Sequence, residues 1–290
     1  MNNGGVEELC KQLDWSLLNA ASSFSAFAGL ATSLMLASMI IILVQYDGDE
    51  NPVAVVALFT VALLALGGDT FIFGAASGEV LCARGNAQGM IGGSTLASGV
   101  VYLLLGITLL QAKFSNAHAG LTLLGNVVTS MAAAGTLALL ALWAVRFVNN
   151  LTILHLRPEP TASYAPSLIL IGIFLAAIVV IALAGPSGQV RKNSIVVTTC
   201  VYLVHIFVTF AMYVATIVIP ADEWTVHTDS LVLTLTLVVA IAFPVVELTG
   251  VVLSLDWRGA RGWRHREAAV PIPAQAKPRS SAKDAGLPTL

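Results

Sequence analysis

Long apolar stretches separated by short polar joints dominate this sequence. A helix needs about 20 apolar residues to cross roughly 30 Å of hydrocarbon. Seven stretches reach that length: 22–45, 52–76, 89–111, 121–146, 166–185, 194–219 and 230–254. Turn-forming or charged residues fill most of the joints, as at 47–52, 84–86, 185–188 and 220–223. Because backbone groups in lipid must be hydrogen-bonded within their own segment, each stretch is expected to be helical. The pattern predicts an all-α integral membrane protein, a seven-transmembrane-helix bundle over residues 22–254.

The two ends of the chain differ from this central domain. In segment 1–21, apolar residues recur at helical spacing, which predicts a short amphipathic helix on the membrane surface. An ordinary polar leader before the first span is the alternative. In segment 255–290, tryptophan and arginine alternate next to the last span, which suits the headgroup region and anionic lipid. After about residue 268 the sequence is rich in Ala, Pro, Ser and Lys, which predicts a disordered tail.

The overall composition agrees with a protein dissolved in lipid. The chain is 57% apolar and 10% charged, against about 25% charged in a soluble domain, and its mean hydropathy is +0.86. These values exclude a soluble enzyme, a secreted disulfide module, a disordered protein and a nucleic-acid-binding protein. The 3 cysteines cannot form a complete set of pairs, and we interpret Cys200 as a small hydrophobic residue within a helix.

The basic residues predict how the bundle is oriented. With seven spans the chain ends lie on opposite sides, and ten of the 14 Lys and Arg residues fall on the side of the C-terminal tail. Basic residues favour the cytoplasmic side. We therefore predict an outside N-terminus, a cytoplasmic C-terminus and a plasma-membrane location. The abundance of Arg, Ala and Val is typical of a GC-rich bacterium, so that membrane would be the bacterial inner membrane.

Three ionisable residues fall inside the predicted spans: Asp69, His205 and Glu247. Each costs about 2.5–3.5 kcal/mol at a helix centre, so such residues face other helices or a wet cavity. The sixth span adds a polar stripe within an arc of about 80° at 100° per residue. Its members are Thr198, Tyr202, His205, Thr209, Tyr213 and Thr216. The stripe predicts either an interhelical hydrogen-bond seam or a hydrated path in which His205 titrates.

The seventh span contains Pro244 followed by Glu247. The proline ring removes one backbone donor and clashes with the carbonyl of Ala240, so a kink is expected there. From the rise per residue we place Asp69 near the outer face, His205 near the middle and Glu247 nearer the inner face. Asp69 is then too far along the axis to touch Glu247. This order leads to the hypothesis that the three residues form a ladder along which a proton or cation passes.

Small residues at four-residue spacing predict close helix contacts, within the bundle or between copies of the chain. The first span has Ala21, Ser25, Gly29, Ser33 and Ala37, and the third has Gly85, Gly89, Gly93 and Ala97. Such ladders are common in membrane proteins. They therefore predict packing and carry no chemical information.

The sequence offers little evidence for catalysis. No lysine lies in a span, which excludes a retinal Schiff base, and a single spanning histidine argues against paired-histidine haem. There is no HExxH, Walker A or GxSxG motif. We expect neither a metal nor a cofactor, and we lean against an enzyme. The leading hypothesis is permeation, transport or sensing of a proton or small cation along the sixth span. The alternative is a non-catalytic membrane subunit or scaffold that binds partner helices or a second copy of the chain.

Overall fold

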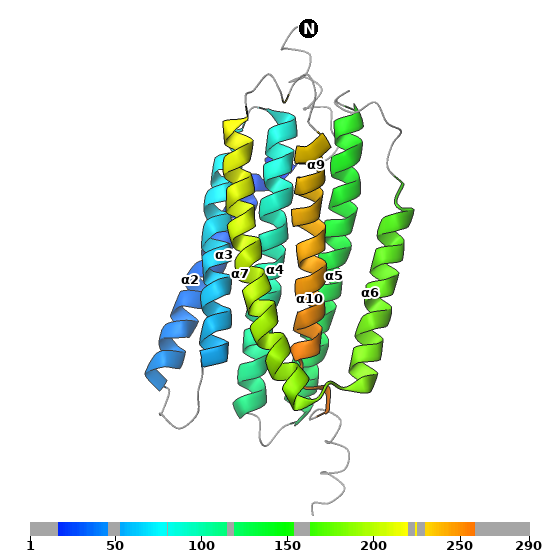
Figure 1. Ribbon diagram of the computed structural model, residues 1–290. Helices are drawn as coiled ribbons and strands as arrows, with labels where there is room; N and C mark the ends of the chain where they lie inside the picture. The colour runs from blue at the N-terminus through cyan, green and yellow to red at the C-terminus, as the bar shows by residue number, and fades with distance from the viewer. Residues whose placement is uncertain are drawn as a thin grey trace, which may run out of the picture.

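The structure is a computed structural model that describes residues 17–45, 53–79, 81–114, 119–153, 163–219, 224 and 230–258. All regular elements in these ranges are helices, arranged as a bundle of nearly parallel rods (Figure 1). The helices are α2 (Leu17–Gln45), α3 (Val53–Ala76), α4 (Cys82–Phe114), α5 (Ala119–Ile153), α6 (Ala165–Ala184), α7 (Gly188–Val218), α9 (Ser230–Leu237), the π-helix η1 (Val238–Ala242) and α10 (Phe243–Ser254).

The predicted number of long apolar helices is confirmed. Seven helices of the described residues are long and apolar enough to cross a membrane, the last of them formed by α9, η1 and α10 in succession. Segment 1–16, with most of the predicted surface helix, lies outside the described residues, as does 259–290, with most of the basic and disordered tail.

One predicted joint is wrong. Residues 84–86, expected to form a turn, lie in the first turns of α4, which begins at Cys82. The Glu79 carboxylate accepts two hydrogen bonds from the Arg84 guanidinium, at 2.6 and 2.9 Å, and one from the Leu81 backbone N–H. This ion pair satisfies both charges beside the helix start. The helix therefore begins seven residues before the point that hydropathy indicated.

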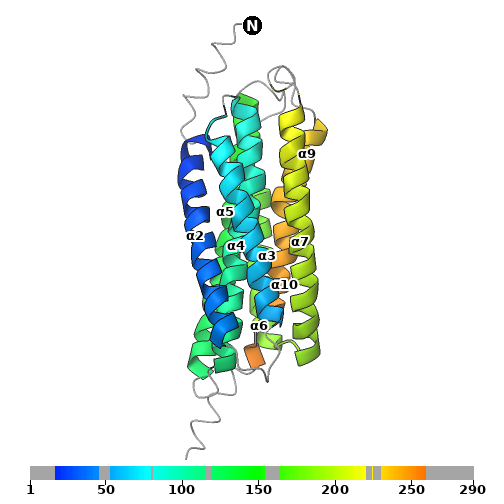
Figure 2. The same cartoon turned by 90° about the vertical axis from the view of Figure 1, so that its left-hand side faces the viewer.

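Helix α4 occupies the centre of the bundle. It contacts α2, α3, α5, α7 and the last helix, whereas α6 stands at the edge and contacts only α5 and α10 among the larger interfaces (Figures 1 and 2). Glycines of α4 let three neighbours approach. A Cβ added at Gly92 would lie 3.0 Å from Ile72 of α3, and one at Gly93 would lie 2.9 Å from the Trp143 ring of α5. At Gly99 the neighbour is Tyr202 of α7, at 2.8 Å.

Only part of the small-residue ladder of the first span makes contacts with other helices. Ser25 Oγ donates to the Thr70 carbonyl of α3 at 2.9 Å, and Gly29 packs against the Thr70 side chain. Ser33 and Ala37 are exposed on the outward face of α2. The contact stripe follows Ala21, Ala28 and Met35 instead, whose spacing of seven residues keeps one face of a helix on its neighbour.

The close approach at Gly99 leads to a stability prediction. Gly99→Ala places a methyl group against the Tyr202 hydroxyl and Leu66, and overpacking of this kind costs about 1–3 kcal/mol. Gly135→Ala is the matched control, because nothing lies within 4 Å of its added Cβ and alanine favours a helix by up to about 1 kcal/mol. Unfolding of both variants in mixed micelles measures the difference. If the two variants had the same free energy of unfolding, Gly99 would not be needed for the close contact between α4 and Tyr202.

Candidate functional site

The centre of the site is a histidine–carboxyl pair between α7 and α10. His205 Nδ1 lies 2.9 Å from Glu247 Oε1, and neither side chain has any accessible surface. His205 lies near the middle of α7, and Glu247 lies one turn after Pro244. The structure therefore brings together two of the three ionisable residues that the sequence singled out.

The break in the seventh span positions this pair. The π-helix Val238–Ala242 ends two residues before Pro244, where the sequence predicted a kink. A π turn widens the helix and removes the need for the hydrogen bond that proline cannot donate. Phe243, at the junction, stacks on the His205 ring with centroids 5.0 Å apart and planes 13° apart. The aromatic ring covers one face of the imidazole and leaves its two nitrogens to polar partners.

The second nitrogen of His205 faces α4. Its Nε2 lies 3.2 Å from Ser94 Oγ, and the Ser94 hydroxyl also donates to the Ile91 carbonyl at 2.7 Å. That hydroxyl has only one proton, so it accepts from Nε2–H when it donates to the Ile91 carbonyl, and otherwise it donates to Nε2. In both arrangements one proton lies between His205 Nδ1 and Glu247 Oε1. The pair is neutral overall in the first arrangement, as imidazole with carboxylic acid or imidazolium with carboxylate, and is imidazole with carboxylate in the second.

Asp69 lies deeper than its sequence position indicated. Thr95 Oγ1 donates to Asp69 Oδ1 at 2.6 Å, and Thr95 follows Ser94, the partner of His205. Adjacent residues of a helix differ by about 1.5 Å in height. Asp69 is therefore close to the level of His205, and it is 1% exposed. The expected order of outer acid, central imidazole and inner acid is corrected, because Asp69 lies near the level of His205.

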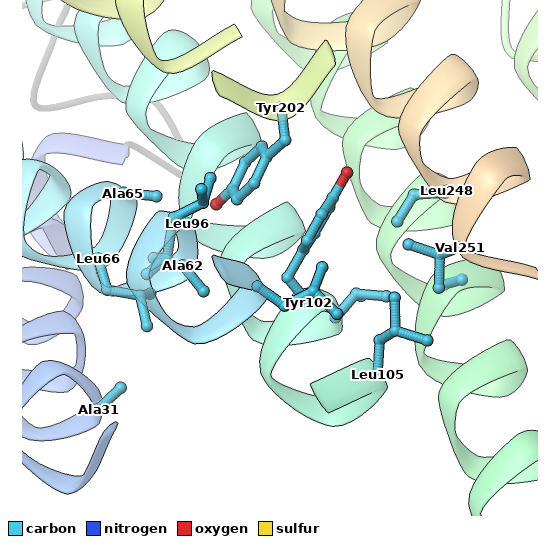
Figure 3. Close-up of a cluster of buried hydrophobic side chains, with 14 of the residues drawn as sticks. Ala31, Ala62, Ala65, Leu66, Leu96, Tyr102, Leu105, Tyr202, Leu248 and Val251 are labelled. Atoms are coloured by element: carbon cyan, nitrogen blue, oxygen red, sulfur yellow. The ribbon is translucent and has the colours of Figure 1, made fainter. Parts of the chain in front are cut away.

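Two tyrosines join these groups. Tyr202 Oη donates to the Thr95 carbonyl at 3.0 Å, and Tyr102 Oη donates to the Thr198 carbonyl at 2.9 Å. Their rings stack with centroids 4.1 Å apart, within the apolar core (Figure 3). The two hydrogen bonds thus connect α4 and α7 in opposite directions, because Tyr202 of α7 donates to α4 and Tyr102 of α4 donates to α7. The two bonds fix the spacing of the helices that hold His205 and Ser94.

The polar stripe of α7 faces into the bundle along its whole length. All six members are buried, as is Ile206 between them. Thr216 accepts a hydrogen bond from the Gln88 side chain at 3.2 Å, and Thr198 packs against Gly250 of α10. Thr209, one turn above His205, has a buried hydroxyl without a hydrogen-bond partner among the described residues.

The interior of the site is closed to the surface but is not fully hydrogen-bonded. Glu247 Oε2 and Asp69 Oδ2 are buried and have no partner among the described residues. An unpaired buried polar group costs about 1–3 kcal/mol, and more if it is charged. Such groups are rare in folded proteins, and their explanations include a catalytic role, strain, or a bound water or ion. The second oxygen of each acid is therefore available to a proton or to an interior water molecule.

Sequence reasoning missed three members of the site: Ser94, Thr95 and Tyr102. The first two resemble ordinary packing residues of a glycine-rich helix. Tyr102 did carry a signal, because a buried tyrosine hydroxyl needs a partner. In the part of the chain that the structure describes, no three His, Cys, Asp or Glu residues gather as metal ligands.

Comparison of the chain with protein-family models, with curated proteins and with solved structures finds no match. The function is therefore argued from the geometry of the site.

Proposed function

We propose that this is an integral membrane protein whose seven long helices cross the bilayer. The outward faces of the bundle support this, because they are covered by large apolar side chains. Leu183, Phe207 and Val218 are 70%, 68% and 74% exposed, and α6 is exposed over most of its surface. Apolar patches of this extent are rare on soluble proteins. In a lipid bilayer, apolar side chains on the outward faces are favourable because they contact the acyl chains.

We propose that the end of the bundle at which α4 begins faces the outside. Cys82, at the start of α4, is disulfide-bonded. Disulfides persist in oxidising compartments and are rare in the cytosol. The opposite end carries Arg191, Lys192 and Arg258, which agrees with a cytoplasmic side. The bacterial inner membrane fits both observations.

We infer that the site transfers protons within or across the bilayer. The observation that carries this proposal is the buried contact of His205 Nδ1 with Glu247 Oε1, in which one proton is shared. The unpaired Oε2 of Glu247 and the Thr209 hydroxyl offer the next positions to which a proton could pass through water. One imidazole and one carboxyl suit a proton better than a metal cation, which prefers several oxygen ligands.

Proton uptake by liposomes tests this function. Full-length protein is reconstituted with an internal pH-sensitive dye, and a potassium gradient with valinomycin supplies the driving force. We expect the lumen to change pH faster than in protein-free liposomes, with no matching uptake of Na⁺. A rate equal to that of protein-free liposomes would contradict the proposal.

A second candidate function rests on a different observation. Ser33 and Ala37 continue the small-residue ladder of α2 but stay exposed on its outward face, which leaves room for a partner helix. A scaffold or subunit role would use this face and would need no proton transfer. Failure of the liposome assay, together with a co-purifying membrane partner, would favour this alternative.

A further inference from the structure

Asp69 of α3 is a buried carboxyl group that the proposed proton transfer does not use. It is 1% exposed, and the Thr95 hydroxyl of α4 provides its one hydrogen bond among the described residues. The second carboxyl oxygen, Oδ2, has no partner there. Thr95 Oγ1 lies 2.6 Å from Asp69 Oδ1 and 3.0 Å from the Gly92 carbonyl oxygen. Because the Thr95 hydroxyl has only one proton, a second proton is needed to make both contacts full hydrogen bonds.

Within the part of the chain that the structure describes, no cation faces Asp69 from α2, α4 or α7, the helices that pack most closely against α3. Helices α2 and α3 contain no other ionisable residue. On α7, His205 lies near this level, but its two nitrogens face Ser94 and Glu247. The Lys and Arg residues of α4 and α7 lie toward the helix ends, about 16 Å or more along the axis from Thr95 or His205. A negative charge on Asp69 would therefore not be balanced.

The nearby hydroxyl groups of α2 and α3 donate to other acceptors. Ser25 donates to the Thr70 carbonyl at 2.9 Å, and Thr70 and Thr32 donate to carbonyls one turn earlier in their own helices, at 2.9 and 2.8 Å. An ionised Asp69 would thus be a buried carboxylate with one hydrogen bond and no counter-ion. Burial of an unpaired charge is so unfavourable that such a group takes up a proton instead.

A protonated Asp69 completes both contacts of Thr95. Its Oδ1–H group donates to Thr95 Oγ1, and the Thr95 hydroxyl donates to the Gly92 carbonyl. The Oδ2 atom is then the carbonyl oxygen of a neutral group, which costs less to leave unpaired than a charge does. In the ionised form, the Thr95 hydroxyl would turn to Oδ1 and leave the Gly92 carbonyl.

We propose that Asp69 is a second proton-binding site, a carboxylic acid at neutral pH whose hydroxyl donates to Thr95. The inference does not depend on proton transfer by the His205–Glu247 pair, because it follows from burial and hydrogen bonding. Thr95 follows Ser94, whose hydroxyl lies 3.2 Å from His205 Nε2, so the two sites lie at nearly the same depth. The bundle therefore has two buried positions that hold a proton, joined by adjacent residues of α4.

Infrared spectroscopy of the full-length protein at neutral pH tests this assignment. A carboxylic acid has a carbonyl stretching band above the amide bands, where a carboxylate does not absorb. We expect Asp69→Asn to remove one such band, while asparagine keeps the size of the side chain and can still donate to Thr95. Glu79→Gln is the matched control, because the Glu79 carboxylate binds Arg84 and its loss should remove no acid band.

Two variants of Thr95 test the hydrogen bond itself. Thr95→Val removes the acceptor and should shift the Asp69 band to higher frequency, whereas Thr95→Ser keeps the hydroxyl and should leave the band in place. Spectra recorded in the Glu247→Gln background contain no Glu247 carboxyl band, so this result is read separately from the proposed function. If Asp69→Asn removed no acid band, the second proton site would be overturned. An unshifted band in Thr95→Val would overturn the hydrogen bond to Thr95. Gel filtration and circular dichroism confirm that each variant is folded.

Discussion

Glu247→Gln lowers the rate of proton uptake by reconstituted protein by roughly a hundredfold or more, the scale on which a positioned acid–base group acts. Glutamine preserves the size of the side chain and can still hydrogen-bond to His205 Nδ1. It cannot release or accept a proton at physiological pH. The variant should therefore fold like the wild type while its transfer step is blocked. Dye fluorescence in liposomes with matched protein content measures the rate.

Glu79→Gln is the control for this experiment. It makes the same chemical change at a carboxylate that binds Arg84 at the upper end of the bundle, away from the pair. We expect it to keep most of the wild-type rate. If Glu247→Gln also retained the wild-type rate, the carboxyl would serve packing alone.

The second large effect is on stability. His205→Leu leaves the Glu247 carboxyl buried without its partner, and breaking a buried pair on one side costs about 3–5 kcal/mol. The double variant His205→Leu with Glu247→Leu removes both polar groups together. It should recover much of that loss, because an apolar replacement of a buried pair is often tolerated. Reversible unfolding in mixed micelles gives the free energies of this double-mutant cycle.

A partly exposed ion pair provides the comparison. Arg191 and Asp256 are 2.8 Å apart but are 32% and 33% exposed, and exposed pairs contribute about 0–1 kcal/mol. A double-mutant cycle in which both residues are replaced by alanine should show little coupling free energy. Additive losses for His205 and Glu247, with no recovery in the double variant, would mean that the two residues do not form a unit.

The helical architecture was predictable because the length of each apolar run in the sequence indicates a helix long enough to cross a membrane. The inward face of α7 was also predictable, since polar side chains at 198, 202, 205 and 209 repeat with the helical period and lipid cannot satisfy them. The start of α4 was not, because hydropathy does not register the Glu79–Arg84 pair.

The site itself depends on contacts between helices that are distant in sequence. Nothing near Ser94 or Thr95 distinguishes them from packing residues until α3 brings Asp69 and α7 brings His205 to the same level. Pro244 indicated a break, but whether it becomes a bend or a π turn depends on how the last helix packs. Axial depth estimated from single spans placed Asp69 too far out for the same reason.

Infrared difference spectroscopy of the purified protein tests the central claim most directly, because it observes the proton of the His205–Glu247 pair. The account predicts a carboxylic-acid carbonyl band that shifts in ²H₂O and is missing from Glu247→Gln. A spectrum identical in the wild type and that variant, or a carboxyl band that does not exchange, would contradict it.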